Sequence, residues 1–183
     1  MTYSRVLAAL LAVFALVLNV RAAEREIKVE GGVAYVIPAN SSFSFAGLEE
    51  PFGSARFTGP LTIRGTYYYG RLAGFPGDEA IGLFFLPDEG DAAGLPYWRY
   101  GGRVREIKFE NPRAFIAAVI PKRFARAVEQ GRRNSVRGRV TLNIDGFEAT
   151  VICGGAIYLT RFRSVAHKPV LLADKGAQPR TTC

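Results

Sequence analysis

Positive charge is the most concentrated chemical feature of this sequence. Between Arg103 and Arg139 there are 11 lysine or arginine residues and three glutamates, which give this segment a formal charge of +8. Cations clustered in this way attract anionic ligands when their side chains converge on one surface. The sequence therefore predicts an anion-binding surface made by Lys122, Arg123, Arg126, Arg132, Arg133, Arg137 and Arg139. The alternative is a solvated basic face that only keeps the protein soluble.

Aromatic side chains near arginines could extend that surface. Tyr67-Tyr68-Tyr69 ends one predicted strand, and Trp98 and Tyr100 follow a loop that contains glycine and proline. Adjacent strand residues point to opposite faces, so Tyr68 should face outward if its two neighbours face the core. Exposed tyrosine and tryptophan can stack on sugar rings or bases. The candidate ligand-binding set therefore includes Tyr68, Trp98 and Tyr100, with packing in the core or at its rim as the alternative.

The residues that could perform catalysis do not form a recognisable set. Carboxylates cluster at Glu49-Glu50, Asp78-Glu79 and 88–91, and two of them could hydrolyse a glycan if they faced one cleft within about 10 Å. His167 is the only histidine, and the sequence contains no Gly-x-Ser-x-Gly, His-Glu-x-x-His or phosphate-loop motif. We therefore predict no catalytic residue, no metal ligand and no cofactor. A carboxylate-based glycan hydrolase remains the enzymatic alternative.

The N-terminus has the pattern of a secretory signal peptide. Arg5 precedes an apolar run that ends at Leu18, and Ala22 is the small residue that a signal peptidase requires. The run is shorter than the roughly 20 apolar residues of a spanning helix, which favours a cleaved signal over a membrane anchor. We expect a signal peptide over 1–22, a single β-rich domain over 23–172, and a flexible tail over 173–183. The mature protein would then be periplasmic or secreted. In such an oxidising compartment Cys153 and Cys183 could form a disulfide. The alternative is a buried Cys153 and a free thiol at Cys183.

Two patterns predict strands along most of the chain: alternating polar and apolar residues, and short apolar runs such as 33–37 and 81–86. We expect these strands over residues 26–30, 33–37, 41–45, 61–69, 81–86 and 105–109. The first two should form a hairpin around Gly31-Gly32, and Gly65 should mark a bulge or a sharp bend.

The second half of the chain predicts one helix and a further hairpin. Residues 121–130 have an amphipathic pattern that stops at Gly131, whereas 112–119 could be helical or extended. Asp145-Gly146 lies between two alternating runs and predicts a tight hairpin turn, followed by a last strand over 156–162.

This order of elements predicts a mainly β fold. We expect a small, partly closed antiparallel barrel or sandwich with one helix around 121–130, an architecture comparable to an OB-fold. Together, the fold, the export signal and the basic segment predict a non-catalytic binding or accessory module. Its ligand would be an anionic polymer or membrane surface, such as a glycan, a wall polymer or lipid head groups. Nucleic acid has the same charge but is the less favoured polyanion outside the cytoplasm. An interaction with an envelope protein, as inhibitor or subunit, is a further alternative.

Overall fold

The computed structural model describes residues 23–29, 34–49, 53–71, 81–152 and 154–173. This part of the chain forms nine strands and three short helices, and the strands make two sheets that do not close into a barrel. The mainly β, partly closed architecture is therefore confirmed. The predicted signal peptide, most of the tail and both cysteines lie outside the described residues, so the domain boundaries and the disulfide remain predictions.

The smaller sheet contains the first predicted hairpin. Strands β1 (Arg25–Lys28) and β2 (Ala34–Ile37) pair antiparallel, with Arg25 opposite Ile37 and Lys28 opposite Ala34. This pairing confirms the predicted hairpin, although its turn lies outside the described residues. The third strand, β6 (Tyr97–Trp98), pairs with β2 and brings Trp98 opposite Tyr35.

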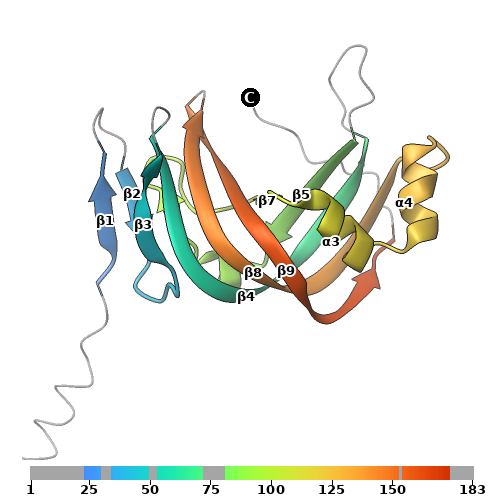
Figure 1. Ribbon diagram of the computed structural model, residues 1–183, viewed down its shortest axis with the longest axis horizontal. Helices are drawn as coiled ribbons and strands as arrows, with labels where there is room; N and C mark the ends of the chain where they lie inside the picture. Colours follow the sequence, from blue (N-terminus) through green and yellow to red (C-terminus); the bar gives the residue numbers. More distant parts are fainter. Residues whose placement is uncertain (1–22, 30–33, 50–52, 72–80, 153, 174–183) are drawn as a thin grey trace, which may run out of the picture.

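Three long strands form the larger sheet. β4 (Ser54–Arg71) pairs with β8 (Ser135–Ile152), and β8 pairs with β9 (Gly155–Leu171). The other edge of β4 is shared by β3 (Ser44–Glu49) along its first part and by β5 (Ile81–Pro87) along its last part. The short strand β7 (Lys108–Phe109) runs parallel to β9. The long strands curve together, and helix α4 (Lys122–Glu129) lies at the opposite end of the molecule from β1 and β2 (Figure 1).

The hairpin predicted at Asp145-Gly146 is wrong, because β8 continues through this pair. Gly146 has φ +71°, and the pairing of β8 with β9 shifts between Asp145 and Phe147. On the other side of β8, β4 shifts its register between Phe57 and Pro60, opposite the same position. Asp-Gly therefore makes a bulge across which the sheet bends, because a glycine with positive φ suits a G1 bulge as well as a type I′ hairpin turn. The observed hairpin joins β8 to β9, with Ile152 opposite Gly155.

The bulge predicted at Gly65 is not found either. The pairing of β4 with β8 runs without a shift through Gly65, which lies opposite Val140. A Cβ atom at Gly65 would lie 2.3 Å from the carbonyl oxygen of Leu86 on β5. Glycine is needed here because two backbones approach closely, which is the other common role of glycine inside a strand.

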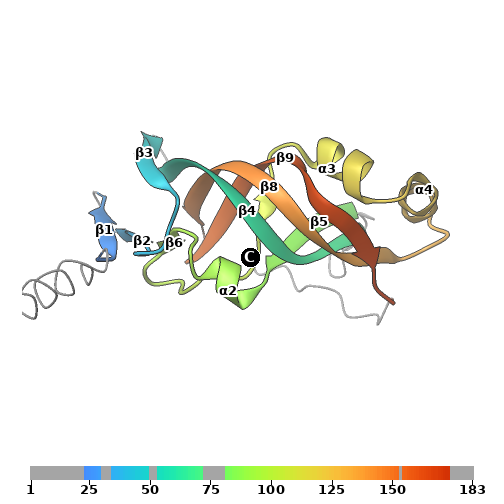
Figure 2. The same cartoon turned by 90° about the horizontal axis from the view of Figure 1, so that it is seen from below.

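Three helices connect the strands. Helix α2 (Glu89–Ala92) is a single turn after β5, and α4 (Lys122–Glu129) confirms the helix predicted around 121–130. The undecided segment is also helical, as α3 (Pro112–Val119). Before α3, Asn111 Nδ2 donates to the carbonyl oxygen of Phe162, and the Phe162 N–H donates to Asn111 Oδ1, each over 2.9 Å. The side-chain amide thus continues the β7–β9 ladder and positions the start of α3 on the sheet. Figure 2 shows α3 and α4 on one side and α2 on the other.

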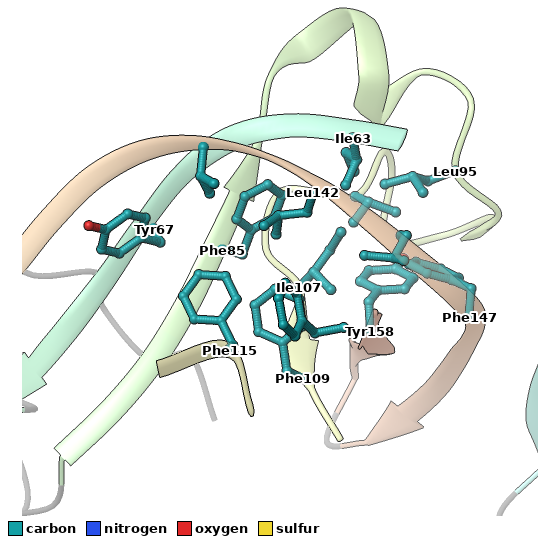
Figure 3. Packing of buried hydrophobic residues seen from close by; sticks show 14 of the residues in the cluster. Ile63, Tyr67, Phe85, Leu95, Ile107, Phe109, Phe115, Leu142, Phe147 and Tyr158 are labelled. Atoms are coloured by element: carbon teal, nitrogen blue, oxygen red, sulfur yellow. The ribbon is translucent and has the colours of Figure 1, made fainter. Parts of the chain in front are cut away.

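The hydrophobic core lies between the inner face of the large sheet and the segments that cover it. Phe115 of α3 is fully buried and stacks on Phe109 of β7, with ring centroids 4.7 Å apart. Its ring also meets Tyr67 of β4 edge-on at 5.7 Å and Phe162 of β9 at 5.6 Å. Figure 3 shows Phe115 and Phe109 side by side among buried residues from the strands. One aromatic cluster therefore joins α3, β7 and the long strands.

Two buried tyrosines make the stability of this core sensitive to alkaline pH. Burial raises the pKa of both Tyr35 and Tyr67 to about 12, and for Tyr35 the nearby Tyr158 and Glu148 contribute further. The Tyr35 hydroxyl donates to the carbonyl oxygen of Gly53 over 2.8 Å. By contrast, the Tyr67 hydroxyl has no hydrogen-bond partner among the described residues and points away from the other labelled side chains (Figure 3).

The substitution Tyr67→Phe is expected to reduce this alkaline sensitivity. Between pH 10 and 12 an unfolded chain loses tyrosine protons that the folded chain retains, so the free energy of unfolding falls as the pH rises through this range. Each buried tyrosine contributes on the order of 2 kcal/mol to the fall. In urea unfolding, Tyr67→Phe should be up to about 1 kcal/mol more stable than the wild type at neutral pH, because it removes an unpaired buried hydroxyl. It should also lose less stability on transfer to high pH. Tyr100→Phe is the control, since Tyr100 is 68% exposed, and an equal alkaline loss in both variants would contradict the prediction.

Candidate functional site

Five of the predicted basic residues surround α4. Lys122, Arg123 and Arg126 belong to the helix, and Arg132 and Arg133 follow it in the connection to β8. The helix buries Ala125 and Val128 against the core, so its other sides are left to solvent. Arg133 is half-buried and the other four basic residues are exposed. We call these five residues, Lys122, Arg123, Arg126, Arg132 and Arg133, the α4 basic cluster.

A phenylalanine ring holds two arginines of this cluster in place. The Arg123 Cζ atom lies 4.7 Å from the centroid of the Phe124 ring, and the Arg133 Cζ atom lies 4.9 Å from it. Cation–π contact orients a guanidinium group without neutralising its charge. Arg133 Nε also donates to the carbonyl oxygen of Ser135, and Arg132 donates to the side chain of Gln130. These neutral partners restrict the arginines and leave their positive charges available to a ligand.

The α4 basic cluster has no acidic partners in the described part of the chain. None of its five side chains forms an ion pair there, and the first turn of α4 carries no acidic residue. Several arginines elsewhere are paired, such as Arg161 with Glu110 at 3.2 Å and Arg163 with Asp145. Arg163 is also the main reason that the pKa of the Asp145 carboxyl lies below its ordinary value. The α4 basic cluster differs from these pairs in that its charges have no carboxylate partner among the described residues.

The two remaining predicted cations lie on the other face of the sheet. Val136 and Val140 of β8 belong to the core, as do the buried residues of α4. Because side chains alternate along a strand, Arg137 and Arg139 point away from that side. Arg139 is also ion-paired, since its Nη2 lies 2.6 Å from Asp88 Oδ2, the oxygen that Arg64 Nε contacts at 2.7 Å. The structure thus brings five of the seven basic residues together and separates Arg137 and Arg139 from them.

The predicted aromatic residues do not join the α4 basic cluster. Tyr68 lies on the face opposite Tyr67, as the alternation predicts, but it is only 4% exposed and its ring packs near that of Phe84, at 6.4 Å between centroids. It therefore cannot stack on a ligand in this conformation. Trp98 is half-buried beneath the exposed Tyr100, with their rings edge-on at 5.9 Å. Trp98 belongs to β6, which pairs with β2. Strand β2 lies at the opposite end of the molecule from α4 in both views (Figures 1 and 2).

Three of the predicted carboxylates that the structure describes, Asp88, Asp91 and Glu49, contact arginine side chains or backbone. Asp88 accepts from Arg64 and Arg139, while Asp91 Oδ2 accepts from the Arg64 backbone N–H over 2.7 Å. Glu49 lies 3.8 Å from Arg56. Glu50, Asp78 and Glu79 lie outside the described residues. Within the described residues no group of three or more His, Cys, Asp or Glu residues is arranged to hold a metal ion.

An open groove that the sequence analysis missed lies next to the α4 basic cluster. Its volume is about 700 Å³, and its lining consists of residues 117–122, from the end of α3 to the start of α4, and residues 168–171 at the end of β9. Eight of these ten residues are alanine, valine, isoleucine, leucine or proline, and the other two are Lys122 and Lys168. The apolar run after Lys168 is the one sequence feature that could have indicated this groove. No local pattern in the sequence shows that this run lies next to residues 117–122.

Comparison with known proteins does not identify a family for this chain. No protein-family model matches this chain, and neither a curated protein nor a solved structure matches it. Among the helices of the described residues, none has the length and apolar character needed to span a membrane.

Proposed function

We propose that this protein is an exported, non-catalytic binding module that uses the α4 basic cluster to hold an anionic ligand. The observation that carries the proposal is a group of five cationic side chains around one helix without a carboxylate partner among the described residues. The export component rests on the leader pattern of residues 1–22. The expected ligand carries one or more phosphate or sulfate groups, as lipid head groups and anionic polymers do.

The geometry around Phe124 explains why arginine suits this role. A guanidinium group donates two parallel hydrogen bonds to a phosphate or sulfate, which a lysine ammonium cannot do. Arg123 and Arg133 are already oriented on one ring, so they lose less side-chain freedom when a ligand binds. Because these side chains are near the surface, binding should weaken as the salt concentration rises.

Replacing four arginines of the cluster is expected to abolish most of this binding. We expect Arg123, Arg126, Arg132 and Arg133, changed together to glutamine, to raise the dissociation constant for heparin at least about 100-fold, which is roughly 0.7 kcal/mol for each arginine. Retention on a heparin column with a salt gradient and a direct binding titration measure this effect.

The matched control removes the same amount of charge from paired arginines. Arg56, Arg99, Arg161 and Arg163 each lie near a carboxylate, with Glu49, Glu26, Glu110 and Asp145 as their respective partners. Exposed pairs of this type contribute about 1 kcal/mol or less each to stability, so the control should remain folded, which circular dichroism verifies. Equal weakening of heparin binding in both variants would show that only net charge matters and would overturn the proposed site.

A further inference from the structure

We propose that the groove beside the α4 basic cluster binds the acyl chain of an anionic phospholipid. This inference rests on the proposed function and makes its ligand more specific: the charged head group would bind the basic residues and one hydrocarbon chain would occupy the groove. The occupant is a single lipid molecule rather than a polymer.

Exposed apolar side chains give the groove its affinity for hydrocarbon. Val170 is 60% exposed and Leu171 is 41% exposed, and both line the groove together with Ile120 and Pro121. Neighbouring apolar side chains left in water on a folded protein often mark a binding surface. The volume of about 700 Å³ also lies within the range of sites for small ligands. An acyl chain would cover this surface without requiring hydrogen bonds from it.

The charges of the lining select an anionic head group. Among the described residues, Lys122 and Lys168 are the only charged ones that line the groove, and none of the lining residues there is a carboxylate. Lys122 is also the first residue of α4, so the groove continues directly into the α4 basic cluster. A phosphodiester at this end would meet Lys122 and the arginines that follow it. A choline head group would instead place a second cation beside the lysines.

The concave form of the site favours one chain over adsorption to a bilayer. The end of α3 and the start of α4 form one wall, and the last residues of β9 form the other. In Figure 1 the end of β9 lies beneath these two helices. A flat membrane surface would contact the rims of such a groove, whereas a single chain contacts its walls.

The test uses lauroyl lysophosphatidylglycerol, below its critical micelle concentration, in a calorimetric titration of the complete protein. We expect this anionic single-chain lipid to bind at least tenfold more tightly than lauroyl lysophosphatidylcholine, which has the same chain, and than glycerophosphoglycerol, which has the same phosphodiester charge but no chain. Binding to phosphatidylglycerol vesicles without binding of the monomeric lipid would overturn the inference.

Variants then separate the contribution of the groove to lipid binding from that of the α4 basic cluster. Val170→Ser with Leu171→Ser should weaken lysophosphatidylglycerol binding at least tenfold and leave heparin retention unchanged. The control is Ile152→Ser, because Ile152 is 44% exposed on β8 and does not line the groove. Lys122→Gln with Lys168→Gln should reduce the preference for the anionic lipid, whereas Lys28→Gln, on β1, should not.

A crosslinking measurement does not depend on these variants. A lysophosphatidylglycerol with a photoreactive group in its chain should label residues 117–122 and 168–171. If heparin binds through the arginines but the lipid neither binds nor labels these segments, the lipid inference is wrong and the proposed function stands. If heparin retention also fails, both are wrong.

Discussion

Replacing Phe115 with alanine should lower the free energy of unfolding by about 3–5 kcal/mol, the loss typical of a large aromatic residue removed from a core. Phe115 is fully buried and contacts the rings of Phe109, Tyr67 and Phe162, which come from β7, β4 and β9. Alanine would leave a cavity where these three strands and α3 meet. Because α3 leads into the groove and then into α4, the same ring also supports the candidate site.

Urea unfolding at neutral pH measures this loss, and Phe45→Ala is the control. Phe45 is 39% exposed and its ring meets Phe57 edge-on at 6.1 Å. Its truncation should cost only about 1 kcal/mol, because less surface is returned to water and the space left behind is open to solvent. Similar losses for Phe115→Ala and Phe45→Ala would contradict the central role of Phe115.

The substitution Gly65→Ala should be the second most damaging single change, with a loss of about 3 kcal/mol or more. The new Cβ would lie 2.3 Å from the carbonyl oxygen of Leu86, 2.7 Å from the Phe85 ring and 2.9 Å from the Pro87 Cα. Two of these atoms are backbone atoms of β5 and cannot move by a change of rotamer. The substitution therefore forces β5 away from β4, where Thr66 pairs with Leu86 and Tyr67 with Phe85.

Gly90→Ala is the matched control for this steric effect. Gly90 lies in α2, and a Cβ there has no atom within 4 Å. Alanine should be neutral or stabilising by about 0.5–1 kcal/mol, because it reduces the freedom of the unfolded chain. Thermal or urea unfolding of both variants checks the difference. A Gly65→Ala protein as stable as the wild type would show that β4 and β5 can separate at little cost.

Ion pairs explain why the overall charge of the chain is a poor guide to its binding surface. Arg139 belongs to the same basic stretch of sequence as Arg132 and Arg133, yet it forms an ion pair with Asp88, which also contacts Arg64. Asp88 is 51 residues from Arg139 and approaches it only because β5 ends beside β4, whose other edge pairs with β8. A count of charges along the sequence includes all of these arginines equally, whereas a ligand would meet only those that lack acidic partners.

The elements with strong local signals were predictable from the sequence alone. Alternation over 26–30 and an apolar run over 33–37, on either side of Gly31-Gly32, predicted the β1–β2 pairing, and an amphipathic pattern stopped by Gly131 predicted α4. The abundance of strand patterns predicted the mainly β fold. In each case the residues that determine the structure are neighbours in the sequence, so hydrophobic periodicity and turn chemistry were sufficient.

Contacts between distant segments decided the rest. Asp145-Gly146 can form a turn or a bulge because both can use a glycine with positive φ, and its bulge was selected by β4, where Pro60 pairs with Asp145 across 85 positions of sequence. Tyr68 is buried because β5 brings Phe84 over it, and Arg137 and Arg139 face away from α4 because the register of β8 turns Val136 and Val140 inward. The groove likewise exists only where residues 117–122 meet residues 168–171. Local sequence determines which backbone conformations are favourable, but which face is covered, and by what, depends on pairing partners that only the folded chain brings together.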